Sequence, residues 1–436
     1  MAHFDSFAPR EQHGRDRYLA DRHMVFAVAY FGYAFCYLVR NNLKLASHPM
    51  ANDLGISPIQ IGFILAAFTV AYAPGKLLMG VLMDRTSMRM MLAGCVAASS
   101  VICAAIPFLS SFLALVVAMA LLGVLQGAGA PAALGMISTW YPNSLRGAAV
   151  TAWNTSQNLG AATLAAFAMV VLDNFSGEWR LIFWIPALIS FIFSIWLFTA
   201  GKERPWQEGH PTLTAMYGKA GLPNTDIHAQ DSYWRLLWSA LTTSPVLFIL
   251  LTLNALLYLV RFGVINWITF YLPEAKGFSL IQAQNTFAAL ELTAIPMVIL
   301  FAFIAWKWPA GMCTVGIISM LVLAGVLLIY RNAQDAHATF YAAALLGGLF
   351  YAPQVIVNVL TVNLLPPRMV GAAVGAVGLS GYLIGEVLAN LAIPGIAARY
   401  GWNSIYLILA AAALLTAILY RWLRPYEKRS VLLAYS

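Results

Sequence analysis

The chain has 436 residues, of which 61% are hydrophobic and only 10% are charged. An ordinary soluble domain carries about 25% charged residues, and so few charges cannot cover this much apolar surface in water. The composition therefore indicates a membrane protein that crosses the bilayer many times. It excludes a single-anchor enzyme, a secreted disulfide scaffold and a β-barrel, whose strands would alternate apolar and polar residues.

Apolar runs long enough to cross a bilayer, about 20 residues each, follow one another along the chain. Residues 1–23 are polar, contain no apolar core of a signal peptide, and form a predicted N-terminal tail. The first set of predicted spans covers residues 24–46, 59–82, 89–108, 111–138, 145–172 and 179–200. A polar stretch with Pro205, Pro211 and Pro223, residues 201–243, is the predicted linker. The second set covers residues 244–272, 283–306, 309–330, 336–364, 369–397 and 402–423, before a tail at 425–436.

This pattern predicts an all-α membrane protein with twelve transmembrane helices in two six-helix bundles, residues 24–200 and 244–424. Most of the 25 Lys and Arg residues fall on the side of the two termini. Such an excess marks the cytoplasmic side, so we expect both termini in the cytoplasm of a multi-pass cell-membrane protein, at the inner membrane if the organism is a bacterium. The formal charge of +8 then reflects topology and not binding to nucleic acid. The segments expected outside carry only Arg180, Lys276, Arg331 and Arg399.

The sequence offers no support for an enzyme or a metalloprotein. It contains no Gly-rich phosphate loop after a strand, no nucleophile–base spacing and no His/Cys cluster. We therefore expect no cofactor. The four cysteines lie inside apolar runs, where their spacing suits neither a metal site nor a disulfide framework, and they are predicted to pack in the membrane: Cys36, Cys95, Cys103 and Cys313.

The two halves repeat each other at a nearly constant spacing. The tetrapeptide Tyr-Leu-Val-Arg occurs at residues 37–40 and again at 258–261, and Gly-Ala-Ala-Val at 147–150 recurs at 371–374. Six spans return the chain to the same side, so the halves are predicted to be parallel repeats about an axis normal to the membrane, as in secondary transporters with a central site. Prolines within the spans also correspond, Pro74 to Pro296 and Pro131 to Pro353.

The loop between the second and third spans reads Gly-Val-Leu-Met-Asp-Arg-Thr-Ser-Met-Arg at residues 80–89. It resembles the loop signature of the major facilitator superfamily. We expect Asp84, Arg85 and Arg89 to clamp helix ends at the cytoplasmic face and to release them as the halves rock. The equivalent stretch of the second half, residues 305–311, keeps one basic residue and lacks the acidic one.

Two arginines lie deep in predicted spans, Arg40 in the first and Arg261 in the seventh. A charge at mid-membrane costs roughly 2.5–3.5 kcal/mol, so each arginine needs a partner or a role. Pseudo-twofold symmetry brings both to the central cavity, where they repel each other unless an anion lies between them. Guanidinium groups donate forked hydrogen bonds to phosphate or carboxylate oxygens. The alternative is that each pairs with a helix carboxylate such as Glu291 or Glu386, or reaches an interface.

The segments around these arginines, residues 33–42 and 258–264, resemble the organophosphate:phosphate antiporter family. So do residues 72–76, 126–131, 146–147, 153–154 and 381–385. The resemblance covers nearly the whole chain. It implies exchange of a sugar phosphate, glycerol phosphate or phosphoglycerate for inorganic phosphate by a protein embedded in the lipid bilayer, which we expect to be a monomer.

The resemblance also implies roles for individual residues. Arg40 and Arg261 carry over as the phosphate clamp and Lys76 as a supporting cation, although Lys76 would alternatively extend toward the inner face. Gln157 stands where well-studied members carry a membrane histidine; it can hydrogen-bond phosphate but cannot gain a charge. The tyrosines that match the family's cavity, or else pack as ordinary aromatics, are Tyr33, Tyr37, Tyr258, Tyr351 and Tyr382.

The remaining candidate residues concern gating and coupling. Glu291 matches a family glutamate and is expected to take a guanidinium while the cavity is empty. Asn41 and Asn266 replace the lysine and aspartate of an ion pair between the halves, so both partners of that gate are neutral here. Glu386 has no counterpart that we recognise, and both roles stay open: pairing with a cation or carrying a proton.

The sequence thus predicts a secondary transporter that exchanges an organic phosphate ester for inorganic phosphate by alternating access. Two alternatives remain open. One is a transporter-like receptor that binds sugar phosphate and signals. The other is a proton-coupled symporter of another organic anion that uses Glu386 or Glu291.

Overall fold

The structure, a computed structural model, describes residues 9–83, 86–175, 178–217, 244–308, 311–365 and 367–435. Within these residues the chain is helical and forms no strand. Among the described residues, twelve helical segments are long and apolar enough to cross a membrane. The predicted fold class is therefore confirmed: an all-α membrane protein with the predicted number of spans.

The N-terminal half follows the predicted order of spans, several of them divided into two helices. Its helices are α1 (Pro9–Leu38), α2 (Asn42–Leu54), α3 (Pro58–Met83), α4 (Met88–Ala105), α5 (Phe112–Gln126), α6 (Gly129–Trp140), α7 (Asn143–Asn154), α8 (Ser156–Asn174) and α9 (Leu181–Ala200). The short helix α10 (Leu213–Tyr217) follows in the region of the predicted linker. Residues 218–243 of that linker lie outside the described residues.

The C-terminal half repeats the arrangement. Its helices are α12 (Pro245–Ile265), α13 (Ile268–Lys276), α14 (Leu280–Lys307), α15 (Met312–Asn332), α16 (Ala336–Leu364), α17 (Pro367–Ser380), α18 (Val387–Tyr400) and α19 (Trp402–Tyr435). A π-helical turn, η5 (Gly381–Glu386), joins α17 to α18 within one span. The division of the chain into tails, bundles and linker stays a prediction, although α1 and α19 extend helically into both predicted tails.

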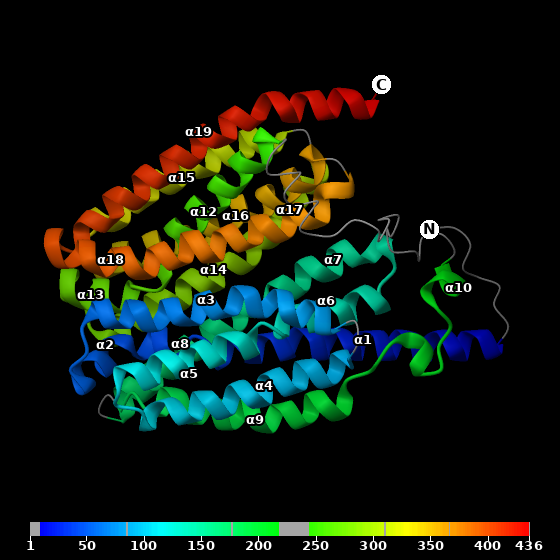
Figure 1. Ribbon diagram of the computed structural model, residues 1–436, viewed down its shortest axis with the longest axis horizontal. Helices are drawn as coiled ribbons and strands as arrows, with labels where there is room; N and C mark the ends of the chain where they lie inside the picture. The colour runs from blue at the N-terminus through cyan, green and yellow to red at the C-terminus, as the bar shows by residue number, and fades with distance from the viewer. Residues whose placement is uncertain are drawn as a thin grey trace.

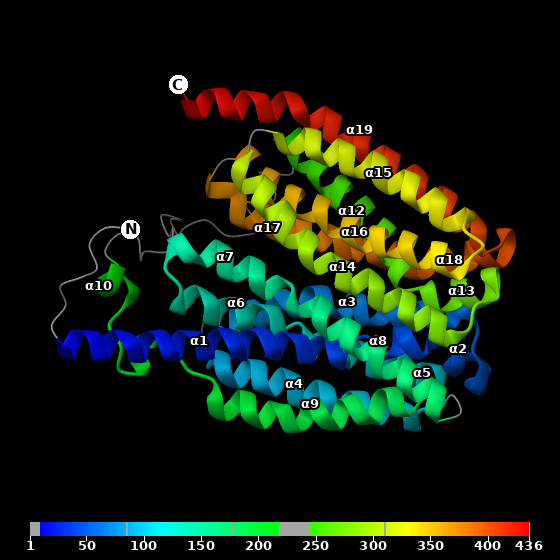
Figure 2. The same cartoon turned by 180° about the vertical axis from the view of Figure 1, so that it is seen from behind.

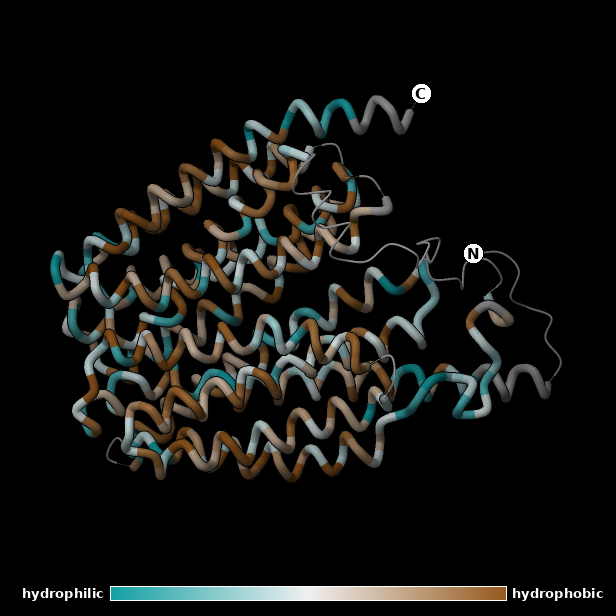
Figure 3. The backbone as a smooth tube through the Cα atoms, viewed as in Figure 1, coloured by the Kyte–Doolittle hydropathy of each residue, from teal (hydrophilic) through white to brown (hydrophobic). Residues whose placement is uncertain are grey.

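The two halves form two bundles that lie side by side, with both termini at the same end of the molecule (Figures 1 and 2). Apolar residues dominate the helices, whereas polar residues gather at the helix ends and in the segment after α9 (Figure 3). Contacts between the bundles are made by α7 and α8 with α14, by α3 with α18 and η5, and by α2 with α13. Toward the termini, α7 and α17 diverge (Figure 1).

Several spans are interrupted near the middle of the molecule. The first span breaks at residues 39–41, between α1 and α2, and the seventh breaks between α12 and α13. The eleventh contains the π-helical turn η5. In a membrane such breaks are tolerated where the freed backbone lines a buried polar region, and π-helical turns are frequent at functional sites. The interruptions therefore indicate where a site between the bundles lies.

Close helix packing repeats in the two halves. A Cβ atom on Gly160 would lie 2.2 Å from the carbonyl oxygen of Ala34, and one on Gly385 would lie 2.2 Å from that of Ala255. These contacts join the first to the fifth span and the seventh to the eleventh. Small residues let membrane helices approach this closely, so the repeat extends from sequence to packing.

Candidate functional site

Arg40 lies in the break between α1 and α2, and its side chain is 5% exposed. Its guanidinium carbon lies 4.2 Å from the ring centre of Tyr72, 4.7 Å from that of Phe68 and 5.1 Å from that of Tyr37. Aromatic faces stabilise a cation without neutralising it. No carboxylate oxygen of the described residues lies within 4.0 Å of Arg40, so its charge is not matched by an ion pair there.

Arg261 lies in α12 and is 7% exposed. Its Nη1 donates to Oε1 of Gln354 at 3.0 Å, and its Nη2 donates to the hydroxyl of Tyr351 at 2.5 Å. Its Nε is buried without a hydrogen-bond partner among the described residues. A buried donor left unpaired is costly, so this nitrogen is a donor that an anionic ligand can satisfy.

Glu291 is linked to Arg261 through the hydroxyl of Tyr351 and to the opposite bundle through Asn158. The Tyr351 hydroxyl, which accepts from Arg261, donates to Oε2 of Glu291 at 3.3 Å. Nδ2 of Asn158, in α8 of the other half, donates to the same oxygen at 2.7 Å. Glu291 therefore reaches the guanidinium indirectly, through Tyr351, and the chain of contacts runs from α12 to α8 across the interface.

Tyr382, in the π-helical turn, packs between aromatic rings of both halves. Its ring centre lies 5.1 Å from that of Tyr72 and 5.0 Å from that of Tyr258. The hydroxyl of Tyr258 accepts from Nε2 of Gln354 at 2.8 Å, which ties it to the Arg261 group. Nζ of Lys76 lies 5.8 Å from the Tyr382 ring centre, so this lysine extends to the aromatic residues between the bundles.

The N-terminal half contributes a second set of polar contacts. Tyr37 donates to Oε1 of Gln157 at 2.9 Å, so the residue at the family's histidine position sits beside the aromatic residues that surround Arg40. Tyr33 packs against Tyr37 with ring centres 5.3 Å apart and against Trp153 at 4.6 Å. Tyr33 thus contacts Tyr37, and Tyr37 in turn faces Arg40.

Glu386 and Lys44 complete the set of buried charges. Glu386, at the end of η5, is 2% exposed, and its Oε2 has no hydrogen-bond partner among the described residues. Its charge interacts with those of Arg40 and Lys44. Lys44, in α2, is buried with Nζ 5.1 Å from the ring centre of Phe262, across the interface.

Sequence reasoning did not assign three residues of this site: Lys44, Asn158 and Gln354. Lys44 follows Arg40 by four residues within the same predicted span, and a second cation in an apolar span was a usable signal. Gln354 follows Pro353 in a predominantly apolar span, where a polar side chain is a candidate functional residue. Asn158 is also a polar residue within a predicted span, but several polar residues precede it there, and only the packing of α8 against α14 reveals that it faces Glu291.

The central site has an excess of positive charge. The buried or half-buried cations outnumber the buried carboxylates Glu291 and Glu386 by two. In a medium of low dielectric constant such an excess attracts a ligand of the opposite charge strongly, and a dianion balances it. The cations are Arg40, Lys44, Lys76 and Arg261.

The bundles close on each other at the end of the molecule opposite the termini. Thr269 donates to the carbonyl oxygen of Lys44 at 2.9 Å, and the hydroxyls of Ser47 and Thr269 lie 3.0 Å apart. Nε2 of Gln284 donates to the carbonyl oxygen of Leu45 at 2.8 Å. Among the described residues, hydrogen bonds between the halves occur only from the middle of the bundle to this end. These hydrogen bonds join neutral groups, and at the same end Nε2 of His48 in α2 lies 4.0 Å from the carboxylate Oε1 of Glu274 in α13.

Asn41 and Asn266, the neutral pair expected at this gate, are both buried near it. Nδ2 of Asn266 donates to Oδ1 of Asn390 at 2.7 Å, within the C-terminal half. Asn390 in turn lies 3.5 Å from the hydroxyl of Thr69 in the other half. Asn266 thus reaches the opposite bundle through Asn390 and not through a contact with Asn41.

Part of the loop signature lies outside the described residues, namely Asp84 and Arg85. Arg89 is described, and its Nε lies 3.4 Å from Oε1 of Glu203, just after α9. The hydroxyl of Ser87 also donates to Glu203. Arg89 is therefore held within the N-terminal half, by the first residues of the predicted linker.

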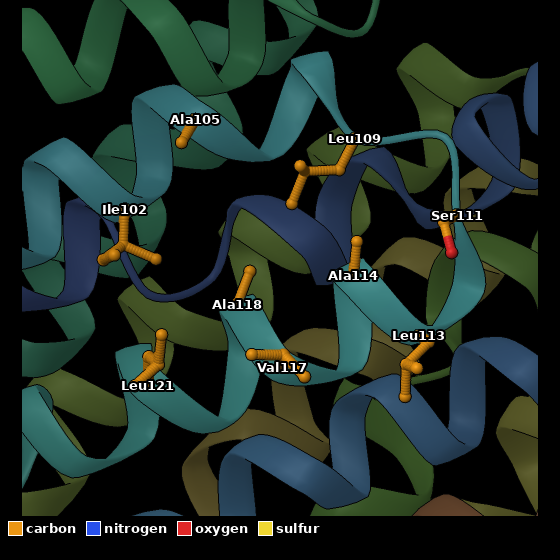
Figure 4. A pocket seen from close by; sticks show the side chains of 9 residues that line it. All are labelled: Ile102, Ala105, Leu109, Ser111, Leu113, Ala114, Val117, Ala118 and Leu121. Carbon is orange, nitrogen blue, oxygen red and sulfur yellow. The ribbon is translucent and has the colours of Figure 1, made fainter.

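A hollow of about 500 Å³ lies away from this site, on α4, α5 and the loop between them. Nine residues line it, and Ser111 is the one polar side chain among them (Figure 4). With no charge in its lining, this hollow does not suit an anion.

The family model of the Major Facilitator Superfamily matches residues 29–389. The chain is 28% identical over 415 residues to a glycerol-3-phosphate transporter of Bacillus subtilis strain 168, covering 91% of each chain. It is 26% identical over 421 residues to a hexose-6-phosphate:phosphate antiporter of Salmonella typhimurium strain LT2, covering 93% of this chain and 91% of that one.

A solved structure with the same fold is that of a bacterial homolog to the human lysosomal transporter Spinster, in an inward-facing and unoccupied conformation. The TM-score is 0.71 at 17% identity, covering 94% of this chain and 97% of that one. At this identity the likeness concerns the fold alone.

Proposed function

Because the chain belongs to the Major Facilitator Superfamily, whose matched relatives are membrane transporters and not enzymes, we propose that it exchanges an organic phosphate ester for inorganic phosphate by alternating access. The substrate class is a sugar phosphate, glycerol phosphate or phosphoglycerate. Both termini lie in the cytoplasm in this proposal, as the distribution of Lys and Arg favours.

One observation carries the proposal: two buried arginines, one from each bundle, lie in a single cluster and have no carboxylate within 4.0 Å among the described residues. The two arginines belong to one cluster because Tyr72, which faces Arg40, packs on Tyr382, which packs on Tyr258, whose hydroxyl is bonded to the Gln354 that accepts from Arg261. Arg40 is surrounded by aromatic faces, and Arg261 keeps a buried Nε without an acceptor among the described residues. A phosphate group offers oxygens in the geometry that guanidinium donors match. Its two negative charges also balance the excess charge of the site.

Exchange follows from this electrostatics. An empty site that closes on itself confines uncompensated cations in low dielectric, so the empty carrier reorients poorly. A bound phosphate or phosphate ester neutralises them and lets the bundles close around it. In the described conformation the contacts lie at the end opposite the termini, which is the arrangement expected when the site is reached from the side of the termini.

Arginine-to-lysine variants test the proposal in proteoliposomes loaded with phosphate. Lysine keeps the charge but cannot donate two hydrogen bonds in a fork. We expect Arg40→Lys and Arg261→Lys each to lower counterflow of a labelled phosphate ester roughly 10- to 100-fold, the equivalent of about 1.5–3 kcal/mol for a lost charged hydrogen bond.

Arg331→Lys is the matched control. Arg331 lies at the C-terminal end of α15, away from the site, and donates to Oδ1 of Asn332 and to the carbonyl oxygen of Asn403. Undiminished exchange in both site variants would contradict the forked phosphate clamp.

The same vesicles separate the two alternatives. A pure receptor binds the ester but exchanges nothing. A proton-coupled symporter accumulates substrate in response to a pH gradient without internal phosphate. One observation supports testing the symporter directly. Oε2 of Glu386 is a buried carboxylate oxygen without a hydrogen-bond partner among the described residues.

A further inference from the structure

The C-terminal helix α19 continues past its apolar part as a basic and aromatic segment. The aromatic side chains of Trp422 and Tyr426 are 59% and 37% exposed. Aromatic residues with one polar edge concentrate at the boundary between lipid and water. The cations of this segment are Arg421, Arg424, Lys428 and Arg429.

This segment borders a hollow of about 810 Å³, which is separate from the central site. Its lining contains all four cations, both aromatic residues, Pro425 and, from α12, Ile249. Glu427, the acidic residue of the same segment, is buried, and its carboxylate oxygens lie 3.2 Å from the backbone nitrogen of Cys313. The lining of the hollow is therefore cationic.

A second hollow, of about 380 Å³, runs between α15 and α19 and shares Arg421 and Arg424 with the first. The two helices lie side by side in both views (Figures 1 and 2). Apart from these arginines and Thr314 its lining is apolar, with Ile318 and Leu414 among the exposed side chains. Arg421 and Arg424 thus stand between a cationic hollow and an adjacent apolar groove on the outer surface of the bundle.

We propose that these joined hollows bind an anionic phospholipid. The cations hold the phosphate and other acidic groups of the headgroup, and an acyl chain lies along the groove between α15 and α19. A soluble phosphate would use the first hollow and leave the groove empty, whereas a lipid uses both. The hollow between α4 and α5 (Figure 4) offers the contrast, since its lining is apolar and carries no cation for a headgroup.

Native mass spectrometry of the delipidated full chain tests the proposal, with phosphatidylglycerol and phosphatidylcholine of identical acyl chains as probes. We expect phosphatidylglycerol to bind at least tenfold more tightly. The double variant Arg421→Gln/Arg424→Gln is expected to lose roughly 30-fold in affinity for phosphatidylglycerol, the equivalent of about 2 kcal/mol at about 1 kcal/mol for each cation near an anionic lipid.

The control Arg204→Gln/Lys307→Gln removes the same charge outside both hollows and is expected to bind like the unmodified protein. Ile418→Trp fills the groove and is expected to weaken long-chain phosphatidylglycerol more than its dihexanoyl analogue. Equal affinity of the unmodified protein for the two headgroups overturns the proposal without any variant. So does equal loss in the two double variants, or displacement of the lipid by millimolar inorganic phosphate alone.

Discussion

Glu386 lowers the positive charge of the central site. It is a carboxylate buried among cations, and no ion-pair partner lies within 4.0 Å of it in the described part of the chain. Its charge acts on Arg40, in the break of the first span, and on Lys44, in α2. It therefore weakens the attraction that these cations exert on an anionic substrate. Glu386 therefore changes the affinity of the Arg40 and Arg261 clamp for phosphate without being part of the clamp.

We expect Glu386→Gln to bind inorganic phosphate roughly fivefold more tightly, because removing one negative charge near the clamp is worth on the order of 1 kcal/mol. Competition of unlabelled phosphate against uptake of a labelled ester measures this affinity. Glu178→Gln serves as the control, since Glu178 is exposed and pairs with Arg180.

The same variant tests the proton-coupled alternative. If Glu386 carries a proton, the glutamine variant loses uptake driven by a pH gradient and gains no affinity for phosphate. Unaltered affinity together with loss of such uptake would contradict the role given to Glu386 here.

Residues of this site differ in how well the sequence alone predicts them. Arg40 and Arg261 stand out because a charge in an apolar span is costly and because the repeat relates them. Tyr351 and Glu291 were predicted as separate residues, yet the link that Tyr351 makes between Arg261 and Glu291 needs coordinates. Lys44 lies within an apolar span, but the sequence does not say which way its helix faces.

At the scale of elements, the sequence predicted the spans but not their interruptions. Apolar runs report where lipid or protein surrounds a helix, and this signal is the same in a continuous helix and in a broken one. The end of the first span also differs from the prediction, because the span continues beyond residue 46 to Leu54. Gly55 ends it in a left-handed conformation with φ 64°. Left-handed glycines commonly end helices.

The contact between the π-helical turn and α12 is expected to depend on glycine at one position. An added methyl group in Gly385→Ala would meet the carbonyl oxygen of Ala255 at 2.2 Å, and overpacking of this kind costs about 1–3 kcal/mol. We expect the variant to unfold at a lower temperature in detergent, as followed by tryptophan fluorescence. Gly395→Ala in the same span is the matched control.

Nothing lies within 4 Å of a Cβ on Gly395, and alanine is favoured over glycine inside a helix by up to about 1 kcal/mol. The control is therefore expected to be as stable as the unmodified protein or slightly more stable. Equal midpoint temperatures for Gly385→Ala and Gly395→Ala would show that the span adjusts without cost, and that the tight approach of η5 to α12 does not constrain the fold.

At the scale of the whole molecule, the two bundles meet at the end opposite the termini through hydrogen bonds between neutral groups and through a 4.0 Å contact between Nε2 of His48 and Oε1 of Glu274. Neutral contacts of this kind each contribute only about 0.5–1.5 kcal/mol net, so a small number of them can be broken and remade during a transport cycle. The positions of the family's ion pair between the halves are occupied here by the uncharged Asn41 and Asn266, so that ion pair does not add to the closure. The closure is thus weak enough to open when the site is occupied.

A cross-link across this closure tests whether opening there is required. The hydroxyls of Ser47 and Thr269 lie 3.0 Å apart, so cysteines at these two positions are near enough for a disulfide after small adjustments. In a background with Cys36, Cys95, Cys103 and Cys313 replaced by alanine, we expect oxidation of Ser47→Cys/Thr269→Cys to abolish counterflow. A covalent bond between α2 and α13 holds the bundles together at one end, so the site opens only toward the other and no substrate crosses.

Reduction is expected to restore the exchange, and each single cysteine variant, treated with the same oxidant, is expected to keep it. These controls separate the effect of the disulfide from loss of the hydroxyl–hydroxyl contact and from damage by the oxidant. Exchange at an undiminished rate in the fully cross-linked protein would contradict alternating access through this end. The bundles would then have to move apart elsewhere, and the contacts between α8 and α14 around Glu291 would be the next place to constrain.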